Sequence, residues 1–374
     1  YAKMRAVSEN CVGLGMWMED IESSAANYQM MLDMNWEAGA INLEEWFKDY
    51  SYARYGGTSE WIDKSNAEIM NSAYRRGGRN FSSMIAARPA VLVINSGPSG
   101  TLGIPGGLDK YVNAWKYLLQ EKDRFADSEG YRYDVVDYAR QTLSFLAQYY
   151  QRDIVIYLYR KDIENFRKAK NRFLELFDDM DRLLNTNRHF MFGKWIADAR
   201  SWATSEKEAD YYAKYAAILP TLWGQDNMEC PRPNWYGYAW REWGGLVGNF
   251  YKYRWSYFWD EVEKELLKGN IYQDCARDKW GRPEFRGNEI LSKLADWEWK
   301  FGENLPEMPS QPVGDAVKVS AELFEKYKSH LESLPAQGPQ FDKLFKAATI
   351  DNVRTQLPVE ENIRKVLSGE PYIK

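Results

Sequence analysis

The sequence predicts a mainly α-helical chain that begins with one strand-and-helix unit and continues as a large all-helical region. Three observations support this fold class. Apolar residues recur at spacings of three and four from about residue 42 to residue 331, which is typical of amphipathic helices. No convincing strand-like alternation of apolar and polar residues occurs in that region. Residues 12–18 form a short, mostly apolar run, as expected for a strand buried on both faces of a parallel sheet.

The apolar run 12–18 ends in an acid, Glu19, and a polar stretch leads into a second element. Ser23 or Ser24 is placed to cap a helix over 25–32. The helical spacing of the apolar residues in that range predicts that Tyr28, Met31 and Leu32 are buried. Functional carboxylates of barrel enzymes stand at the carboxyl ends of strands, where the loops build the cleft. The pattern alone also fits an ordinary strand whose first solvated residue is acidic.

The helical region is divided by capping and stop signals. Asn42 is placed to cap one helix and Gly56 to end it, and Ser205 with Glu208 resembles a capping box. Two prolines within 227–234 argue against helix there, after which the helical pattern resumes at residue 235. The periodicity predicts helices over 42–55, 61–74, 108–120, 131–150, 166–184, 205–216, 235–266, 291–299 and 317–331.

Composition limits the functional classes. A net charge of −5 gives no indication of nucleic acid or an anionic membrane surface as a partner. No apolar run approaches the ~20 residues that a membrane span needs. Only His189 and His330 are present, and Cys11, Cys230 and Cys275 lie far apart, so we expect no catalytic serine–histidine pair, metal centre, disulfide framework or cofactor. Carboxylates are the available catalytic groups.

Aromatic residues make up 16% of the chain, which fits either a bulky core or surfaces that stack against sugar rings. They are densest around the irregular segment 227–234, which two predicted helices frame. The residues alone leave two interpretations of this segment open, a sugar-stacking ledge and a helix-packing corner filled with aromatic rings.

Five separated parts of the chain carry distinctive motifs. They are G-L-G-M-W-M-E at 13–19 with 28–36, A-R-Y-G at 53–56, R-Y-D-x-x-D-x-x-R-Q at 132–141, T-L-W-G at 221–224 with 238–255, and P-S-Q-P-x-G-D-x-V at 309–317. Together these segments resemble the α-N-acetylglucosaminidases of glycoside hydrolase family 89. The resemblance covers residues 1 to about 335. Asp20 and Gly237 depart from the family pattern, and the loop after residue 224 is longer than usual. We interpret the charges of the segment 132–141 as structural pairs at i, i+3 spacing rather than as catalytic groups.

The resemblance implies an architecture and a set of site residues. Residues 1–40 would be the C-terminal end of a (β/α)8 catalytic barrel, 41–334 an all-helical C-terminal domain contributing to the active-site cleft, and 335–374 a C-terminal helical extension. The catalytic nucleophile falls on Glu19, and the residues that line the sugar pocket fall on Trp223 and Tyr238. The family's acid/base glutamate is expected upstream of this chain.

The function implied is that of the C-terminal portion of a retaining exo-glycosidase that hydrolyses terminal α-linked N-acetylglucosamine from glycans. The partners implied are such a glycan and an N-terminal segment of the same protein that completes the barrel. Because the chain starts without a methionine or a signal-like stretch, we expect it to be a piece of a longer protein. The family implies a secreted, periplasmic or lysosomal location.

A non-catalytic helical carbohydrate-binding or scaffold module is the alternative. Such a module would keep the aromatic ledge but would have no use for Glu19. A helical-toroid glycosidase or lyase would need a regular series of paired helical hairpins and its own acid and base, and the sequence shows neither.

Overall fold

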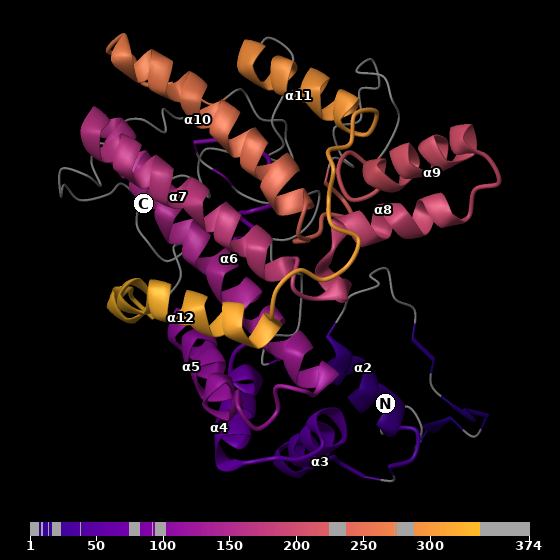
Figure 1. The fold of residues 1–374 in the computed structure, drawn as a ribbon. Coiled ribbons are helices and arrows are strands. Elements are labelled where there is room, and N and C mark those ends of the chain that lie inside the picture. Colours follow the sequence, from indigo (N-terminus) through magenta and orange to yellow (C-terminus); the bar gives the residue numbers. More distant parts are fainter. Residues whose placement is uncertain are drawn as a thin grey trace.

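The computed structural model describes residues 7–8, 10–13, 15–16, 24–37, 39–74, 83–91, 93, 102–223, 237–272, 274 and 288–336. Helices account for most of these residues (Figure 1). They are α2 (Ala25–Asp33), α3 (Leu43–Tyr55), α4 (Glu60–Met70), α5 (Leu108–Leu118), η1 (Leu119–Glu121), α6 (Glu129–Tyr159), α7 (Ile163–Leu184), η2 (Arg188–Phe190), α8 (Phe192–Ser201), α9 (Glu206–Ile218), the π-helical turn η4 (Val247–Tyr251), α10 (Lys252–Leu267), α11 (Glu289–Phe301) and α12 (Ala316–Ser333).

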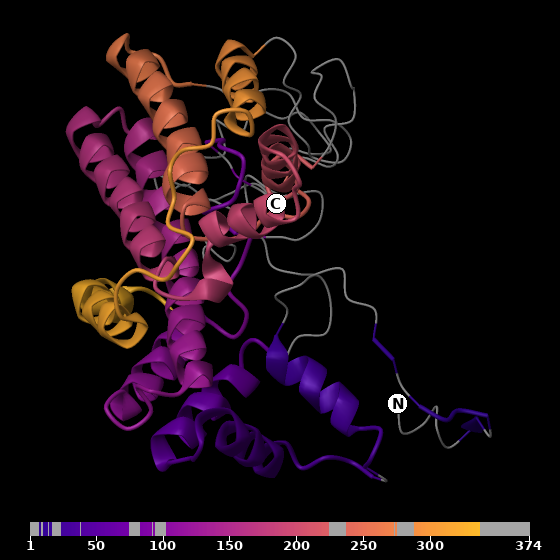
Figure 2. The same ribbon diagram turned by 45° about the vertical axis from the view of Figure 1, so that its right-hand side comes forward.

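The long helices α6 and α7 pack side by side at the centre of the fold. Helices α3 and α4 gather at one end of this pair and α10 and α11 at the other, as both views show (Figures 1 and 2). Helix α12 packs across α5, α6 and α7, and α8 pairs with α9. The predicted mainly helical fold is confirmed for the described part of the chain.

The core follows the predicted apolar stripes. On α7 every member of the stripe is at most 2% exposed: Phe166, Ala169, Phe173, Phe177, Met180 and Leu184. The predicted faces of α5 and α6 are buried as well, with Trp115 and Leu143 both fully enclosed. Because burying such side chains contributes about 1.5–3 kcal/mol each, these stripes determine which faces of the helices meet.

The observed caps agree with the predicted ends of α3 and the predicted start of α9, whereas α6 runs on to Tyr159 and α4 ends at Met70. The Asn42 side chain accepts hydrogen bonds from the first turn of α3, and Gly56 ends that helix in the left-handed conformation at φ 82°. Ser205 accepts a hydrogen bond from the Glu208 amide. The Glu208 carboxylate reaches back to the amide and hydroxyl of Thr204 rather than to Ser205, so the capping box is displaced by one residue on that side.

Helix α2 differs from the prediction in what it buries. Ser24 is its N-cap, as predicted. Of its residues only Ala26 is buried, whereas Met31 is 40% and Leu32 48% exposed and Tyr28 is half-buried. The prediction of a buried face was wrong for this structure because none of the described residues covers that side of the helix.

The strand predicted at 12–18 is not seen where the structure describes it. Residues 12–13 and 15–16 have no β-structure, and the Val12 side chain is fully exposed. Among the described residues the sole β-pairing is an isolated bridge between Met191 and Gly244. A strand needs a neighbour to satisfy its backbone groups, so the barrel end stays a prediction. Glu19 itself lies outside the described residues.

The helix predicted from residue 235 was wrong over its first part. A turn covers 237–239, residues 240–243 have no regular secondary structure, and the helix begins at Leu246. Gly237 and Gly245 have φ of 69° and 86°, values that side-chain-bearing residues rarely adopt. Gly244 lies so close to Asn185 that a Cβ would stand 2.6 Å from the amide carbon of that side chain. Gly237 and Gly245 therefore permit the turns on either side of the non-helical segment.

The start of that helix is fixed from a distant element. The Asp181 carboxylate, on α7, accepts hydrogen bonds from the amides of Gly245 at 2.6 Å and Gly248 at 2.7 Å. It therefore satisfies amides at the helix N-terminus that have no intrahelical partner. Burial raises the pKa of Asp181, against the lowering effect of these amides.

Three further expectations concern the limits of the chain and membranes. The C-terminal extension predicted at 335–374 falls almost entirely outside the described residues, as does the aromatic loop 224–236. The division into domains is therefore still a prediction. Among the described helices, none is long and apolar enough to cross a membrane.

Candidate functional site

Two of the three predicted site residues lie against each other. The ring centroids of Trp223 and Tyr238 are 5.2 Å apart, with an angle of 47° between the ring planes. Both rings are half-buried, so they present aromatic surface that the core does not enclose. The pair stands at the two ends of the loop 224–236, and the third predicted residue, Glu19, is not described.

The backbone at Trp223 is held in an unusual conformation. Its φ is 47°, a left-handed value uncommon for residues other than glycine. The Ile218 carbonyl accepts hydrogen bonds from the amides of both Leu222 at 3.0 Å and Trp223 at 2.8 Å, which fixes the backbone just after the end of α9. Such strain persists where surrounding contacts over-determine it, and it clusters at functional sites.

Three hydrogen bonds connect the two sides of the loop. The Gly237 amide donates to the Thr221 carbonyl at 3.1 Å. The Tyr251 hydroxyl donates to the Pro220 carbonyl and accepts from the Arg241 amide, both at 3.4 Å. Because Tyr251 is 1% exposed, this bridge lies inside the protein. The ends that carry the aromatic pair are thereby held at a fixed separation.

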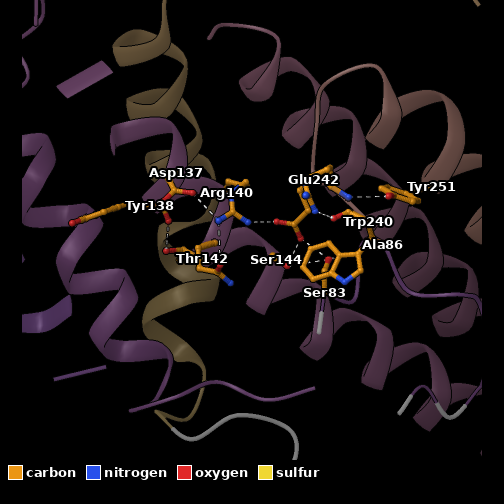
Figure 3. A network of polar contacts seen from close by, with 12 residues as sticks. Ser83, Ala86, Asp137, Tyr138, Arg140, Thr142, Ser144, Trp240, Glu242 and Tyr251 are labelled. Atoms are coloured by element: carbon orange, nitrogen blue, oxygen red, sulfur yellow. Dashed lines mark hydrogen bonds and ion pairs between the residues drawn. The ribbon is translucent and has the colours of Figure 1, made fainter. Parts of the chain in front are cut away.

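The segment after Tyr238 is anchored through Glu242, which is 5% exposed (Figure 3). One carboxylate oxygen accepts hydrogen bonds from the hydroxyls of Ser83 at 2.5 Å and Ser144 at 2.6 Å. The other accepts from the Arg140 guanidinium. A buried carboxylate needs such partners, and here they come from two elements distant in sequence.

Arg140 joins this anchor to α6. Its guanidinium also binds the Asp137 carboxylate at 2.7 and 2.9 Å, the predicted i, i+3 pair. Burial acts to lower the pKa of Arg140, but Asp137 and Glu242 raise it above its ordinary value. The arginine is therefore a permanent cation between two carboxylates, and the prediction of structural pairing is confirmed for this residue.

A second buried pair lies one turn earlier on α6. The Asp134 carboxylate receives two hydrogen bonds from the Arg54 guanidinium, at 2.6 and 2.7 Å, and one from the Tyr55 hydroxyl at 2.6 Å. Burial raises the pKa of Asp134, against the hydrogen bonds from Arg54 and Tyr55. This pair fixes the A-R-Y-G end of α3 against α6.

The described part of this site is suited to binding. Indole and phenol rings pack well against the apolar faces of a hexose. The nearby carboxylate of Glu242 is held by an arginine and two serines, so it is not free to attack a sugar carbon. No group of three or more possible metal ligands occurs among the described residues.

Sequence reasoning missed the anchoring residues. Arg140 stood in a motif that we singled out, but Glu242, Ser83 and Ser144 carry no spacing signal, because they are brought together from segments 61 to 159 residues apart. The one local signal is an acid, Glu242, within an aromatic stretch.

The fold is that of the helical C-terminal domain found in a family of glycoside hydrolases. The family model of the α-N-acetylglucosaminidase (NAGLU) C-terminal domain matches residues 46–326. The chain belongs to this family.

Known proteins are similar over most of the chain. The human α-N-acetylglucosaminidase is 27% identical over 322 residues, which cover 84% of this chain and 40% of that protein. The family 89 glycoside hydrolase from Clostridium perfringens matches with a TM-score of 0.76 in complexes with 2-acetamido-1,2-dideoxynojirmycin and with PUGNAc, at 26% and 25% identity. Each match covers 87% of this chain and 36% of that one. The chain thus spans less than half the length of these relatives.

Proposed function

We propose that this chain is the C-terminal part of a retaining exo-glycosidase that releases terminal α-linked N-acetylglucosamine from glycans. The Trp223–Tyr238 pair carries this proposal, because it presents two fixed aromatic rings in a chain that belongs to the NAGLU C-terminal family. The human relative is an α-N-acetylglucosaminidase. The bacterial relative is a glycoside hydrolase in complex with a 2-acetamido compound.

The mechanism that we propose uses two carboxylates about 5–5.5 Å apart, as retaining glycosidases do. Glu19 attacks the anomeric carbon and the glycosidic bond breaks, while a glutamate of the preceding barrel donates a proton to the leaving oxygen. That glutamate then takes a proton from water, which displaces Glu19. Trp223 and Tyr238 hold the sugar by ring stacking, which places the anomeric carbon for attack.

The proposed architecture assigns residues 1–40 to the end of a (β/α)8 barrel, 41–334 to the helical domain and 335–374 to a helical extension. The exposed apolar side of α2 supports it: Met31 is 40%, Leu32 48% and Trp36, just beyond the helix, 88% exposed. Contiguous exposed apolar groups mark a surface that another part of a protein covers. We assign that role to the N-terminal segment of the same protein, in a secreted, periplasmic or lysosomal enzyme.

The test is hydrolysis of an aryl α-N-acetylglucosaminide by the full-length protein with Glu19→Gln. Loss of the nucleophile should lower turnover at least about 10³-fold, because the covalent route is closed. Glu44→Gln, which changes an exposed glutamate on α3, is the matched control and should leave turnover unchanged. If both variants hydrolyse at the same rate, the assignment of Glu19 is wrong. If the unsubstituted protein binds the sugar but never cleaves it, the chain is a carbohydrate-binding module.

A further inference from the structure

A cavity of about 280 Å³ lies between α2, α3, α4, α5 and α6. Its volume is close to the lower end, about 300 Å³, of the pockets that hold small molecules. Ser24, the N-cap of α2, closes one side, where its hydroxyl lies 2.7 Å from that of Tyr74. The cavity therefore forms where α2 meets the helical domain.

The cavity wall carries hydrogen-bonding groups that have no partner. Within the described part of the chain, the hydroxyls of Tyr50 and Tyr138 make no hydrogen bond, and the Gln141 side chain uses its oxygen alone. The Asp137 carboxylate binds Arg140 through one oxygen and leaves the other unpaired. Donors and an acceptor thus line the same space, a combination that matches hydroxyl groups, which both donate and accept.

The two tyrosines are fixed as neutral groups. Burial, and after it the Asp134 charge, raises the pKa of both Tyr50 and Tyr138 well above the ordinary value for tyrosine. Both hydroxyls therefore keep their protons and can donate. The rings of Phe47 and Phe145 also line the cavity, and they provide the apolar surface against which a ring can pack.

The charges around the cavity exclude an anion. The two carboxylates that line it, Asp134 and Asp137, are paired with the guanidiniums of Arg54 and Arg140. Arg140 is also paired with Glu242, which does not line the cavity. Both arginines are already engaged by carboxylates, so neither is available to a phosphate or a carboxylate ligand.

We propose that this cavity binds a neutral, hydroxyl-bearing ring of monosaccharide size, with Tyr50, Tyr138, Gln141 and Asp137 as its polar contacts. The cavity supplies a second carbohydrate-binding function to the chain. It uses neither Glu19 nor the Trp223–Tyr238 pair, so it stands whether or not the proposed hydrolysis is correct.

The experiment is titration of the full-length protein with D-glucose, read by calorimetry or ligand-observed NMR. The double variant Tyr50→Phe/Tyr138→Phe should bind about 10- to 30-fold more weakly, since it loses two hydrogen bonds of about 1 kcal/mol each. These hydroxyls have no protein partner, so their removal should leave the unfolding curve in place. Tyr52→Phe is the control, because Tyr52 lies on the same helix and is 63% exposed. It should bind as the unsubstituted protein does.

Two further arms separate the sites. Trp223→Ala should retain D-glucose binding within about twofold. D-glucuronate should bind at least about tenfold more weakly than D-glucose, because its carboxylate would lie near Asp134 and Asp137 with no free cation to pair with. The proposal is overturned if D-glucose does not bind at millimolar concentrations, if the double variant binds it normally, or if Trp223→Ala alone abolishes binding. The hydrolysis test with Glu19→Gln is read independently of all three.

Discussion

The Arg140 guanidinium connects Asp137, on its own helix, to Glu242, on the segment that follows Tyr238 (Figure 3). This single side chain therefore joins α6, the longest described helix, to the segment that carries Tyr238 of the Trp223–Tyr238 pair. Glu242 has almost no contact with water. The position of Tyr238 therefore depends on the buried ion pair between Arg140 and Glu242.

Glu242→Ala should lower the free energy of unfolding by about 3 kcal/mol, because removing one partner of a buried pair leaves the other charge uncompensated. Denaturant titration measures this loss. Glu303→Ala breaks the ion pair of a half-exposed glutamate with Lys214 and should cost at most about 1 kcal/mol. Equal losses for the two variants would show that the buried pair has no special role.

The same variant, Glu242→Ala, tests whether Glu242 holds Tyr238 in position for substrate binding. Glu242→Ala should raise KM for an aryl α-N-acetylglucosaminide about tenfold or more, because small displacements of binding groups are costly. Glu242→Gln keeps an acceptor for the two serines and should recover part of the affinity. An unchanged KM in Glu242→Ala would show that Glu242 does not position Tyr238 for substrate binding.

Trp223→Ala should reduce kcat/KM by about 10- to 150-fold, since the indole would lose roughly 1.5–3 kcal/mol of contact with the sugar. Steady-state kinetics of the full-length protein measures the change. Trp202→Ala is the control, because Trp202 follows α8, which pairs with α9, and is 81% exposed. If both tryptophan variants retain full activity, Trp223 does not contact the substrate.

Much of the helical domain could be predicted because its determinants are local. The stripe on α7 repeats at helical spacing, and Asn42 caps α3 through atoms two and three residues away. The non-helical segment 240–243 could not be predicted. Its conformation depends on Glu242 binding side chains at 83, 140 and 144, and the helix that follows begins where Asp181 accepts its amides. Neither relationship leaves a periodic signal.

The candidate site also has parts that could be predicted from the sequence and parts that could not. Trp223 and Tyr238 were assigned through a family resemblance, and the structure brings their rings into contact. The burial predicted for α2 was wrong because periodicity identifies an apolar face but not the part of the protein that covers it. The unpartnered hydroxyls of Tyr50 and Tyr138 in the cavity could not be predicted from sequence patterns either, because the cavity depends on how five helices meet.

The cap of α9 should be sensitive to acid. Hydrogen bonds from the Tyr212 hydroxyl, then from the amide and hydroxyl of Thr204, lower the pKa of Glu208 from its ordinary value to about 2. The ionised Glu208 carboxylate therefore stabilises the folded protein at pH values above 4.5, its pKa in the unfolded chain. This contribution disappears as the pH falls toward 2. Glu208→Gln should lower Tm at pH 7 but not at pH 2.

Thermal unfolding between pH 7 and pH 2 measures the difference in Tm between the unsubstituted protein and Glu208→Gln. Glu206→Gln serves as the comparison, since Glu206 lies in the same helical turn and its side chain makes no hydrogen bond with the described residues. Its effect on Tm should be smaller at pH 7. A constant difference for Glu208→Gln between pH 7 and pH 2 would contradict the assigned cause.

The central claim is that this chain supplies the nucleophile of a retaining glycosidase, and the most direct measurement is the mass of the peptide that contains Glu19. The full-length protein should be acid-quenched during turnover of an activated α-N-acetylglucosaminide and then digested. The account predicts that this peptide gains the mass of one N-acetylglucosaminyl group, attached at Glu19. Steady turnover with that peptide unmodified and the adduct on another carboxylate would contradict it.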